Sequence, residues 1–385
     1  MCNGSSRFLR KFFRKIMHKD FLPFEEALEK RKLNGTLRTL QTRQKGIDFY
    51  SNDYLGFAGN QEFQKMLLEA VQDNPRLLTG STGSRLISGN TEIITETENF
   101  IAREHQYESA LLFPSGYNAN LALFSALPQR HDSIIIDEKI HRSIHDACKM
   151  SNCRKLKFKH NDCDHLENIL KRQQSKVYIA VESLYSMDGD IAPLAEIAKL
   201  AEKYNAGLII DEAHAFGVFG YGLVDSLKLQ KKVLATVVTY GKALGTNGAA
   251  ILTHTVIKSY LINFASPFIY TTSSHDFQWM SIFKGYHFLN ANRKLLTQLQ
   301  ENIKIFRWQK IKTPSHENSP IQAVIIPDNE QLKALKNTLS DQGFLTYAIF
   351  SPTVKECTER LRICIHSFNK TKDIIDLTQT IKNFI

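Results

Sequence analysis

The alternation of short apolar runs with helical patterns between residues 133 and 253 most strongly constrains the fold of this chain. The runs are SIIIDEKIH, KLKFKH, KVYIAVESLYS, GLIID, VLATVVTY and AAILT, and a helical segment spans residues 193–204. Mostly β-branched runs that are separated by helices indicate a largely parallel sheet with helices on both faces. The sequence therefore predicts an α/β domain whose functional residues lie at the carboxyl ends of its strands.

Polar side chains directly follow these runs. They are His141, Glu182, Ser186, Asp211, His214, Thr239 and Lys242. Desolvation lowers the pKa of a lysine such as Lys242, which lies among small residues in TYGKALG, and leaves a nucleophilic amine. Asp211 lies 31 residues earlier, at the end of another run. An amine that forms an imine and a carboxylate that keeps a pyridine nitrogen protonated are the groups that pyridoxal phosphate requires.

Each of these residues also has an ordinary interpretation. Most lysines are exposed on loops, and a histidine such as His141 or His214 is more often a satisfied structural residue than a catalytic one. An arginine such as Arg362 is often a member of a structural ion pair. The ordered pair of Asp211 and Lys242 favours the cofactor interpretation over these alternatives.

Two upstream stretches suit an anionic ligand. The glycine- and hydroxyl-rich segment TGSTGSRLISGN (residues 79–90) lets the backbone approach a ligand closely, although its composition also fits a flexible linker. In ALLFPSGYNANLALFSAL (residues 110–127), an apolar run passes through Ser115 and Gly116 into a helix, whose first amides form a phosphate site. Neither stretch matches the Walker or dinucleotide fingerprint, which argues against a nucleoside triphosphate or NAD.

The pattern changes after residue 255. It is helical to about residue 300, and from about residue 320 short strands alternate with helices. This predicts a small α/β domain with an antiparallel or mixed sheet. We expect an N-terminal helical segment with a basic amphipathic tail over residues 1–46, a large domain over residues 47–285 and a small domain over residues 286–385.

The net charge of +10 is concentrated near the N-terminus. Six of the 49 Lys and Arg residues precede the first acidic residue, and the remaining 43 face 39 acidic side chains. The nearly balanced body argues against nucleic-acid binding. The tail has the pattern of a basic amphipathic helix, and we favour docking of its apolar side on its own protein over contact with a membrane surface or an acidic partner.

The six cysteines form no CxxC pair and no zinc-type spacing, so we expect reduced thiols in a cytoplasmic protein without a metal site. No apolar run approaches the length that spans a bilayer.

Eight motifs together resemble one enzyme family. They are SNDYLGF, GSTGSRLISGN, FPSGYNAN, SMDGDIAPL, DEAHAFGVFG, TYGKALG, YTTS and SPTV followed by ERLRICIHSF. Their order is similar to that of the α-oxoamine synthases, fold-type I pyridoxal-phosphate enzymes that join an amino acid to an acyl thioester. The resemblance runs from about residue 25 to the C-terminus. It is strongest to members that condense L-alanine with a pimeloyl thioester in biotin synthesis.

The resemblance implies roles for individual residues. Lys242 would form the Schiff base, Asp211 would pair with the pyridinium nitrogen, and the His141 ring would stack on the cofactor. His214 would contact the phenolic oxygen of the cofactor, with further contacts from Ser115, Gly116, Tyr117, Glu182, Ser186 and Thr239, and from Thr271 and Thr272 of the second subunit of a homodimer. Substrate ligands would be Arg38, Asn52 and Arg362. Phe350 and Ser266 stand where the family often has arginine, which leaves a second cationic contact to the acyl substrate open.

Three alternatives stay open at this point. The chain resembles glycine C-acetyltransferases and serine palmitoyltransferases in the same family, which use other substrates. A catalytically silent scaffold would keep the fold for binding alone. The acyl donor is either a coenzyme A thioester or a carrier-protein thioester.

Overall fold

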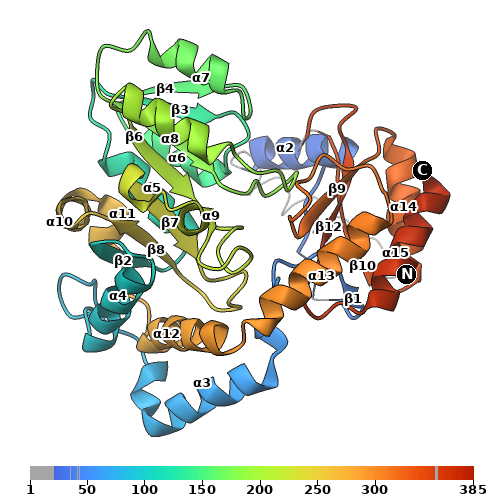
Figure 1. The fold of residues 1–385 in the computed structure, drawn as a ribbon, viewed down its shortest axis with the longest axis horizontal. Helices are drawn as coiled ribbons and strands as arrows, with labels where there is room; N and C mark the ends of the chain where they lie inside the picture. The colour runs from blue at the N-terminus through green and yellow to red at the C-terminus, as the bar shows by residue number, and fades with distance from the viewer. Residues whose placement is uncertain (1–20, 35, 41, 43, 352–353) are drawn as a thin grey trace, which may run out of the picture.

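The computed structural model describes residues 21–34, 36–40, 42, 44–351 and 354–385. The chain forms a large α/β lobe and a smaller C-terminal lobe (Figure 1). The amphipathic tail predicted from the sequence lies outside the described residues. Within the described part of the chain, no helix combines the length and the apolar character needed to cross a membrane.

The large lobe is organised around a seven-stranded sheet. Its strand order is β2 (Ser109–Phe113), β8 (Ala249–Thr253), β7 (Ala235–Thr239), β6 (Gly207–Asp211), β5 (Val177–Glu182), β3 (Ser133–Asp137) and β4 (Arg154–Phe158). Only β8 runs antiparallel to its neighbours, and all other pairings are parallel. The mostly parallel sheet predicted from the sequence is confirmed.

Helices cover both faces of this sheet because the side chains of each strand alternate between the faces. Ile134 and Ile136 of β3 pack in the layer of α5 (Gly116–Ala126), α6 (Arg142–Met150), α10 (Thr255–Phe264) and α11 (Ser266–Ile269). Ile135 packs on the opposite side with α7 (Cys163–Leu170), α8 (Leu194–Lys203) and α9 (Leu223–Ser226). On that side, α4 (Glu92–Glu104) and α12 (Asp276–Ala291) pack beside β2, and α3 (Gln61–Asp73) packs on α12.

The small lobe contains the predicted antiparallel sheet. Its order is β11 (Tyr347–Ile349), β12 (Arg360–Cys364) and β9 (Ile321–Ile325), with α13 (Lys294–Trp308), α14 (Asn329–Asp341) and α15 (Thr371–Phe384) packed around it. The short strand β1 (Ile47–Asp48) pairs in parallel with β10 (Phe344–Leu345). Residues 47–48 therefore join the small lobe before the chain enters the large one, and the boundaries 47–285 and 286–385 stay a prediction.

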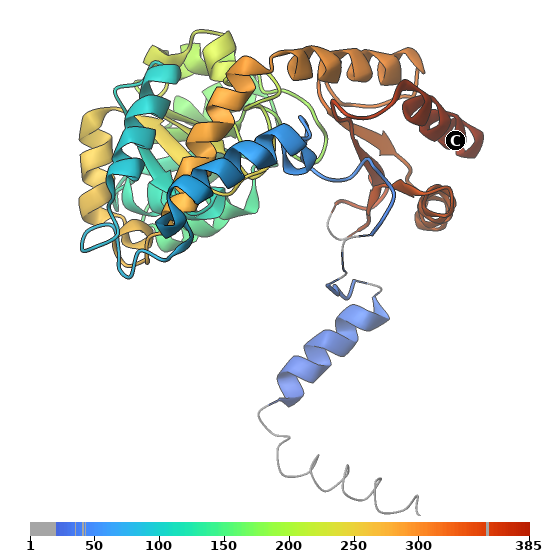
Figure 2. The same cartoon turned by 90° about the horizontal axis from the view of Figure 1, so that it is seen from below.

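The N-terminal helix α2 (Leu22–Leu33) has no buried residue. Figure 2 shows it apart from both lobes. Its side chains Phe24 and Leu33 are 67% and 80% exposed. Isolated helices of this length are marginal in water, so we expect α2 to pack against a partner other than the described residues.

The loop between β5 and α8 contacts the small lobe through hydrogen bonds and an ion pair. The Asp188 carboxylate contacts Arg360 of β12, and it also accepts a hydrogen bond from Lys139 Nζ at 2.7 Å. The Asp188 carbonyl accepts a hydrogen bond from Ser315 Oγ at 2.5 Å. The Ser186 carbonyl accepts from Arg362 Nε at 2.8 Å. The loop thereby fixes the position of β12, and of Arg362 on it, relative to the large sheet.

Substitution of Gly217 tests how tightly the turn after β6 packs against Ala243, the residue after Lys242. Its φ is +79°, and an added Cβ would lie 2.3 Å from Ala243 Cβ, whereas Gly220 at φ +64° has open space. We expect Gly220→Ala to lower the free energy of unfolding by about 1 kcal/mol through backbone strain alone. Gly217→Ala should lower it by about 2–4 kcal/mol, because overpacking adds to the strain.

Urea denaturation of both variants measures the difference. Equal losses of stability would show that the contact with Ala243 does not constrain this turn.

Candidate active site

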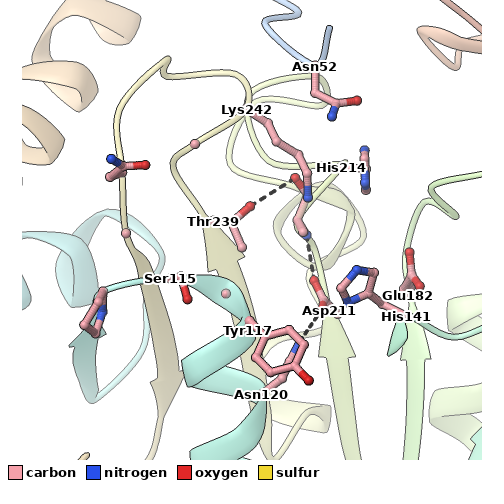
Figure 3. A pocket seen from close by; sticks show the side chains of 16 residues that line it. Asn52, Ser115, Tyr117, Asn120, His141, Glu182, Asp211, His214, Thr239 and Lys242 are labelled. Carbon is pink, nitrogen blue, oxygen red and sulfur yellow. Dashed lines mark hydrogen bonds between the residues drawn. The ribbon is translucent and has the colours of Figure 1, made fainter. Parts of the chain in front are cut away.

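A cavity of about 320 Å³ opens at the carboxyl ends of β5, β6 and β7, beside the N-terminus of α5 (Figure 3). It brings together many of the residues predicted from the sequence: Asn52, Ser115, Gly116, Tyr117, His141, Glu182, Asp211, His214, Thr239 and Lys242. This is the location expected for a ligand site in an open α/β sheet, since the strands end there and the crossovers leave a crevice.

Lys242 and Asp211 point into the cavity from neighbouring strand ends, and the lysine side chain extends toward Asp211 (Figure 3). Burial lowers the pKa of Lys242, while the electrostatic interaction with Asp211 partly opposes that shift. Asp211 is 5% exposed, and its carboxylate accepts hydrogen bonds from Asn120 Nδ2 at 2.8 Å and from the Ala213 amide at 2.9 Å. The site therefore combines a desolvated amine with a carboxylate held by two donors.

His141 lies at the N-terminus of α6 and lines the same cavity. Its Nδ1 accepts from the Ser143 amide at 3.3 Å and lies 2.8 Å from Ser143 Oγ. Burial lowers the pKa of His141, and Lys242 adds to this effect, whereas Asp211 raises the pKa.

Glu182 is buried near Asp211, Lys242 and His141. Burial raises the pKa of its carboxyl group to about 8, and the nearby Asp211 carboxylate acts in the same direction. Lys242 and the backbone amides of His141 and Ser186 oppose the shift. One oxygen, Oε1, has no hydrogen-bond partner among the described residues. At neutral pH the Glu182 side chain is therefore a neutral acid.

A second group of hydrogen bonds borders the cavity where the two lobes meet. Tyr54 Oη lies 2.7 Å from His214 Nδ1 and donates to Asn52 Oδ1 at 3.2 Å. Arg362 Nη2 donates to the same Asn52 oxygen at 2.9 Å. Burial lowers the pKa of His214 strongly, and the positive charges of Lys242 and Arg362 lower it further. His214 is therefore neutral, and Arg362 supplies a cation beside the cavity.

The N-terminus of α5 forms the opposite side of the cavity. Ser115 caps this helix by accepting from the Asn118 amide at 3.3 Å, and the first amides of any α-helix lack partners within the helix. A Cβ on Gly116 would lie 2.5 Å from Thr239 Cγ2, so only glycine lets helix and strand approach this closely. A phosphate group fits such a helix terminus.

Some predicted residues lie outside the cavity lining. Arg362 reaches it through Asn52, and Ser186 contributes its carbonyl to Arg362. Thr271 and Thr272 follow α11, where Thr272 forms an isolated bridge with Ser84. Arg38 is exposed in the segment after α2. The roles predicted for these five residues stay predictions.

Several lining residues were not predicted from the sequence, namely Pro114, Asn120, Ala213, Gly241, Asn247 and Gly248. Asn120 could have been found, because it lies one helical turn after Gly116 and therefore on the same side of α5. Tyr54 and Ser143 carry no local signal of their own and were found only through their contacts.

The groups around the cavity fit pyridoxal phosphate. Lys242 can bind its aldehyde, Asp211 its ring nitrogen, and the α5 terminus its phosphate, while Asn120 Oδ1 is buried without a partner among the described residues. Within the same part of the chain, no group of three or more His, Cys, Asp or Glu residues could hold a metal ion.

Comparison with known proteins agrees with this geometry. Residues 44–376 match the aminotransferase class I and II family. The chain is 34% identical over 390 residues to the 8-amino-7-oxononanoate synthase of Emericella nidulans, covering 94% of each protein. The crystal structure of 8-amino-7-oxononanoate synthase from Francisella tularensis superposes with a TM-score of 0.75 at 28% identity, covering 88% of this chain and 97% of that one.

Serine palmitoyltransferase from Sphingomonas wittichii has the same fold. It superposes with a TM-score of 0.82 at 24% identity, covering 96% of this chain and 98% of that one.

The raised pKa of Glu182 predicts a pH-dependent stability difference. Its folded-state pKa of about 8 lies above the ordinary value of 4.5, so its contribution to stability is complete below pH 4.5 and is lost as the pH rises toward 8. Glu182→Gln mimics the neutral acid and removes this loss. We expect the variant apoprotein to be more stable than the wild type by about 3 kcal/mol at pH 7, with no difference below pH 4.5.

Urea denaturation between pH 4 and pH 8 measures this difference. Glu69→Gln, at an exposed glutamate on α3, is the matched control for the substitution itself. A Glu182→Gln difference that is independent of pH would exclude the raised pKa.

Proposed function

The chain belongs to the aminotransferase class I and II family, as a pyridoxal-phosphate-dependent acyltransferase of the α-oxoamine synthase group, and we propose that it condenses L-alanine with a pimeloyl thioester. The products would be 8-amino-7-oxononanoate, carbon dioxide and the free thiol. The observation that carries this proposal is the convergence of Lys242 and Asp211 on one buried cavity. The similarity to 8-amino-7-oxononanoate synthases along nearly the whole chain supports the substrate choice.

The cofactor, when bound, supplies an electron-withdrawing ring that stabilises negative charge at the α-carbon of the amino acid. Asp211 would hold the ring nitrogen in its protonated state through charge. His141 would cover the ring, and His214 would contact its oxygen substituent. Ser115, Gly116, Tyr117 and Thr239 would hold the phosphate at the α5 terminus.

Lys242 would move the proton of the amino acid substrate. Its amine is buried, and its pKa is lowered from the ordinary value of 10.5, so more of it is unprotonated at neutral pH than in an exposed lysine. A neutral amine close to the α-carbon is a suitable general base. Because Glu182 is neutral below about pH 8, it does not add a second negative charge that would return the proton to Lys242.

Arg362 and Asn52 would bind the carboxylate of the amino acid. Arg362 is 7% exposed and is oriented by the Asn52 oxygen and the Ser186 carbonyl, at 2.9 and 2.8 Å. A guanidinium that is fixed on two sides still offers further N–H donors to a carboxylate. Arg38 would lie near the acyl donor, which is either coenzyme A or a carrier protein.

A homodimer would complete the site. The segments 79–90 and 270–273 are held together by Ser273 N donating to the Gly83 carbonyl at 2.9 Å. They expose neighbouring apolar side chains, with Ile87 at 86% and Tyr270 at 83%. Such a surface favours association with a second copy, which would bring Thr271 and Thr272 to the partner's cavity.

The cofactor and substrate assignments have a direct test. The purified protein should take up pyridoxal phosphate, and borohydride should fix the cofactor onto Lys242. Lys242→Ala should lose the fixation and lower kcat by about 10²–10⁴-fold, as expected for loss of a catalytic base. The matched control is Lys149→Ala, at an exposed lysine on α6.

Release of carbon dioxide and thiol should be fastest with L-alanine and a pimeloyl thioester. Glycine with acetyl-CoA and serine with palmitoyl-CoA are the competing pairs. Preference for either pair would contradict the substrate proposal, and failure to take up the cofactor would indicate a binding scaffold.

The dimer proposal predicts that Ile87→Glu weakens association. Burying an unpaired carboxylate in the interface costs at least about 2 kcal/mol, which raises the dissociation constant about 30-fold or more. Trp308→Glu on α13 is the control, since Trp308 is 75% exposed outside the proposed interface. Sedimentation velocity over a range of concentrations measures both variants, and an unchanged Ile87→Glu dimer would place the interface elsewhere.

A further inference from the structure

A chain of hydrogen bonds connects the Asp211 carboxylate to the His141 ring through Asn120 and Ser143. Asn120 Nδ2 donates to Asp211 Oδ2 at 2.8 Å and to Ser143 Oγ at 3.0 Å. Ser143 Oγ lies 2.8 Å from His141 Nδ1. Asn120 and Ser143 are 2% and 0% exposed, so water does not compete for these bonds.

The direction of each hydrogen bond follows from the donors available. Asp211 Oδ2 accepts a hydrogen bond, so the Asn120 amide turns its nitrogen toward it. The same nitrogen donates its second hydrogen to Ser143 Oγ. The single hydroxyl hydrogen of Ser143 is then free to point at His141 Nδ1. The Ser143 backbone amide donates to the same ring nitrogen at 3.3 Å.

The position of His141 at the N-terminus of α6 also favours a neutral ring with an unprotonated Nδ1. Its side chain caps α6 by accepting a backbone N–H, as an N-cap residue does. The positive end of the helix dipole disfavours a second proton on the ring. Lys242 also lowers the pKa of the His141 ring, whereas Asp211 raises it. Glu182 and His214 are the other titratable groups near the ring.

We propose that Asn120 and Ser143 are positioning residues that keep His141 neutral, with its proton on Nε2. Among the described residues Nε2 has no hydrogen-bond partner, so its N–H remains available to donate to an oxygen atom of a bound ligand. The role of the Nε2 N–H in ligand binding rests on the proposed function, whereas the protonation state of His141 does not.

Nitrogen-15 NMR of the histidine-labelled apoprotein tests the proposal without catalysis. The wild type should show His141 with an unprotonated Nδ1 and a protonated Nε2 at neutral pH, and His141→Gln identifies the signal by its absence. Ser143→Ala removes one of the two donors to Nδ1, and the pKa of His141 should rise by about 0.5–1 unit. Ser143→Thr keeps the hydroxyl group and should restore the wild-type value.

Asn120→Ala should act differently. It leaves the Ser143 hydroxyl free to rotate and to accept a hydrogen bond, so a fraction of His141 with the proton on Nδ1 should appear. The matched control is Ser151→Ala at the other end of α6, where the hydroxyl group accepts from the Cys153 amide at 3.2 Å and has no link to His141. It should leave the His141 signal unchanged.

The loaded enzyme provides a second measurement. If His141 must be neutral, activity falls as the pH drops through its pKa. The acid limb of the kcat profile should therefore move up by the same 0.5–1 unit in Ser143→Ala, with the wild-type limb restored in Ser143→Thr.

A wild-type His141 that carries its proton on Nδ1, or that is cationic at neutral pH, would overturn the proposal, and this result needs no variant to fold. An unchanged His141 signal in Ser143→Ala would overturn it as well. A protein that shows the predicted tautomer and yet binds no pyridoxal phosphate would instead contradict the proposed function.

Discussion

The removal of Lys242 from water is the physical condition on which the rest of the site depends. Burying a cation costs free energy, and only a few acidic groups lie near Lys242 to offset that cost. The Asp211 carboxyl group interacts with Lys242, while Glu182, whose pKa is raised to about 8 by burial, is neutral at physiological pH. His141 and His214 are neutral because burial and the nearby cations lower their pKa values. The cavity thus places the Asp211 carboxyl group beside an amine whose pKa is lowered by burial.

This arrangement is a consequence of the sheet topology. The crossovers of a parallel sheet place the carboxyl ends of β5, β6 and β7 side by side, and each strand contributes a polar residue at or just after its end. The residues are distant in sequence, yet they need no long loops to meet. Close approach of α5 to β7 at Gly116 adds the helix terminus to the same crevice.

The sequence was sufficient to predict a mostly parallel sheet, the succession of strands and helices along the chain, and the proximity of Lys242 to Asp211. These features depend on β-branched runs and strand-end residues, which are local signals. The antiparallel direction of β8 was not predicted. It could have been, because the loop between VLATVVTY and AAILT is too short for the crossover that a parallel strand requires. The hydrogen-bonded partners were mostly missed. Tyr54 contacts His214 across 160 positions of sequence, and Asn120 contacts Ser143 across 23 positions, so neither contact follows from a periodic pattern.

The two groups of hydrogen bonds differ in how they depend on the lobes. The chain from Asp211 to His141 uses only β6, α5 and α6, which pack together in the large lobe. The group around Asn52 joins His214 to Arg362, which lies on β12 of the small lobe and is held by the Ser186 carbonyl. A change in the angle between the lobes would therefore move the predicted substrate ligands and leave the groups around Asp211 in place. The ion pair between Asp188 and Arg360 opposes such a change, because Asp188 would keep Lys139 as a partner while the buried Arg360 would lose this carboxylate.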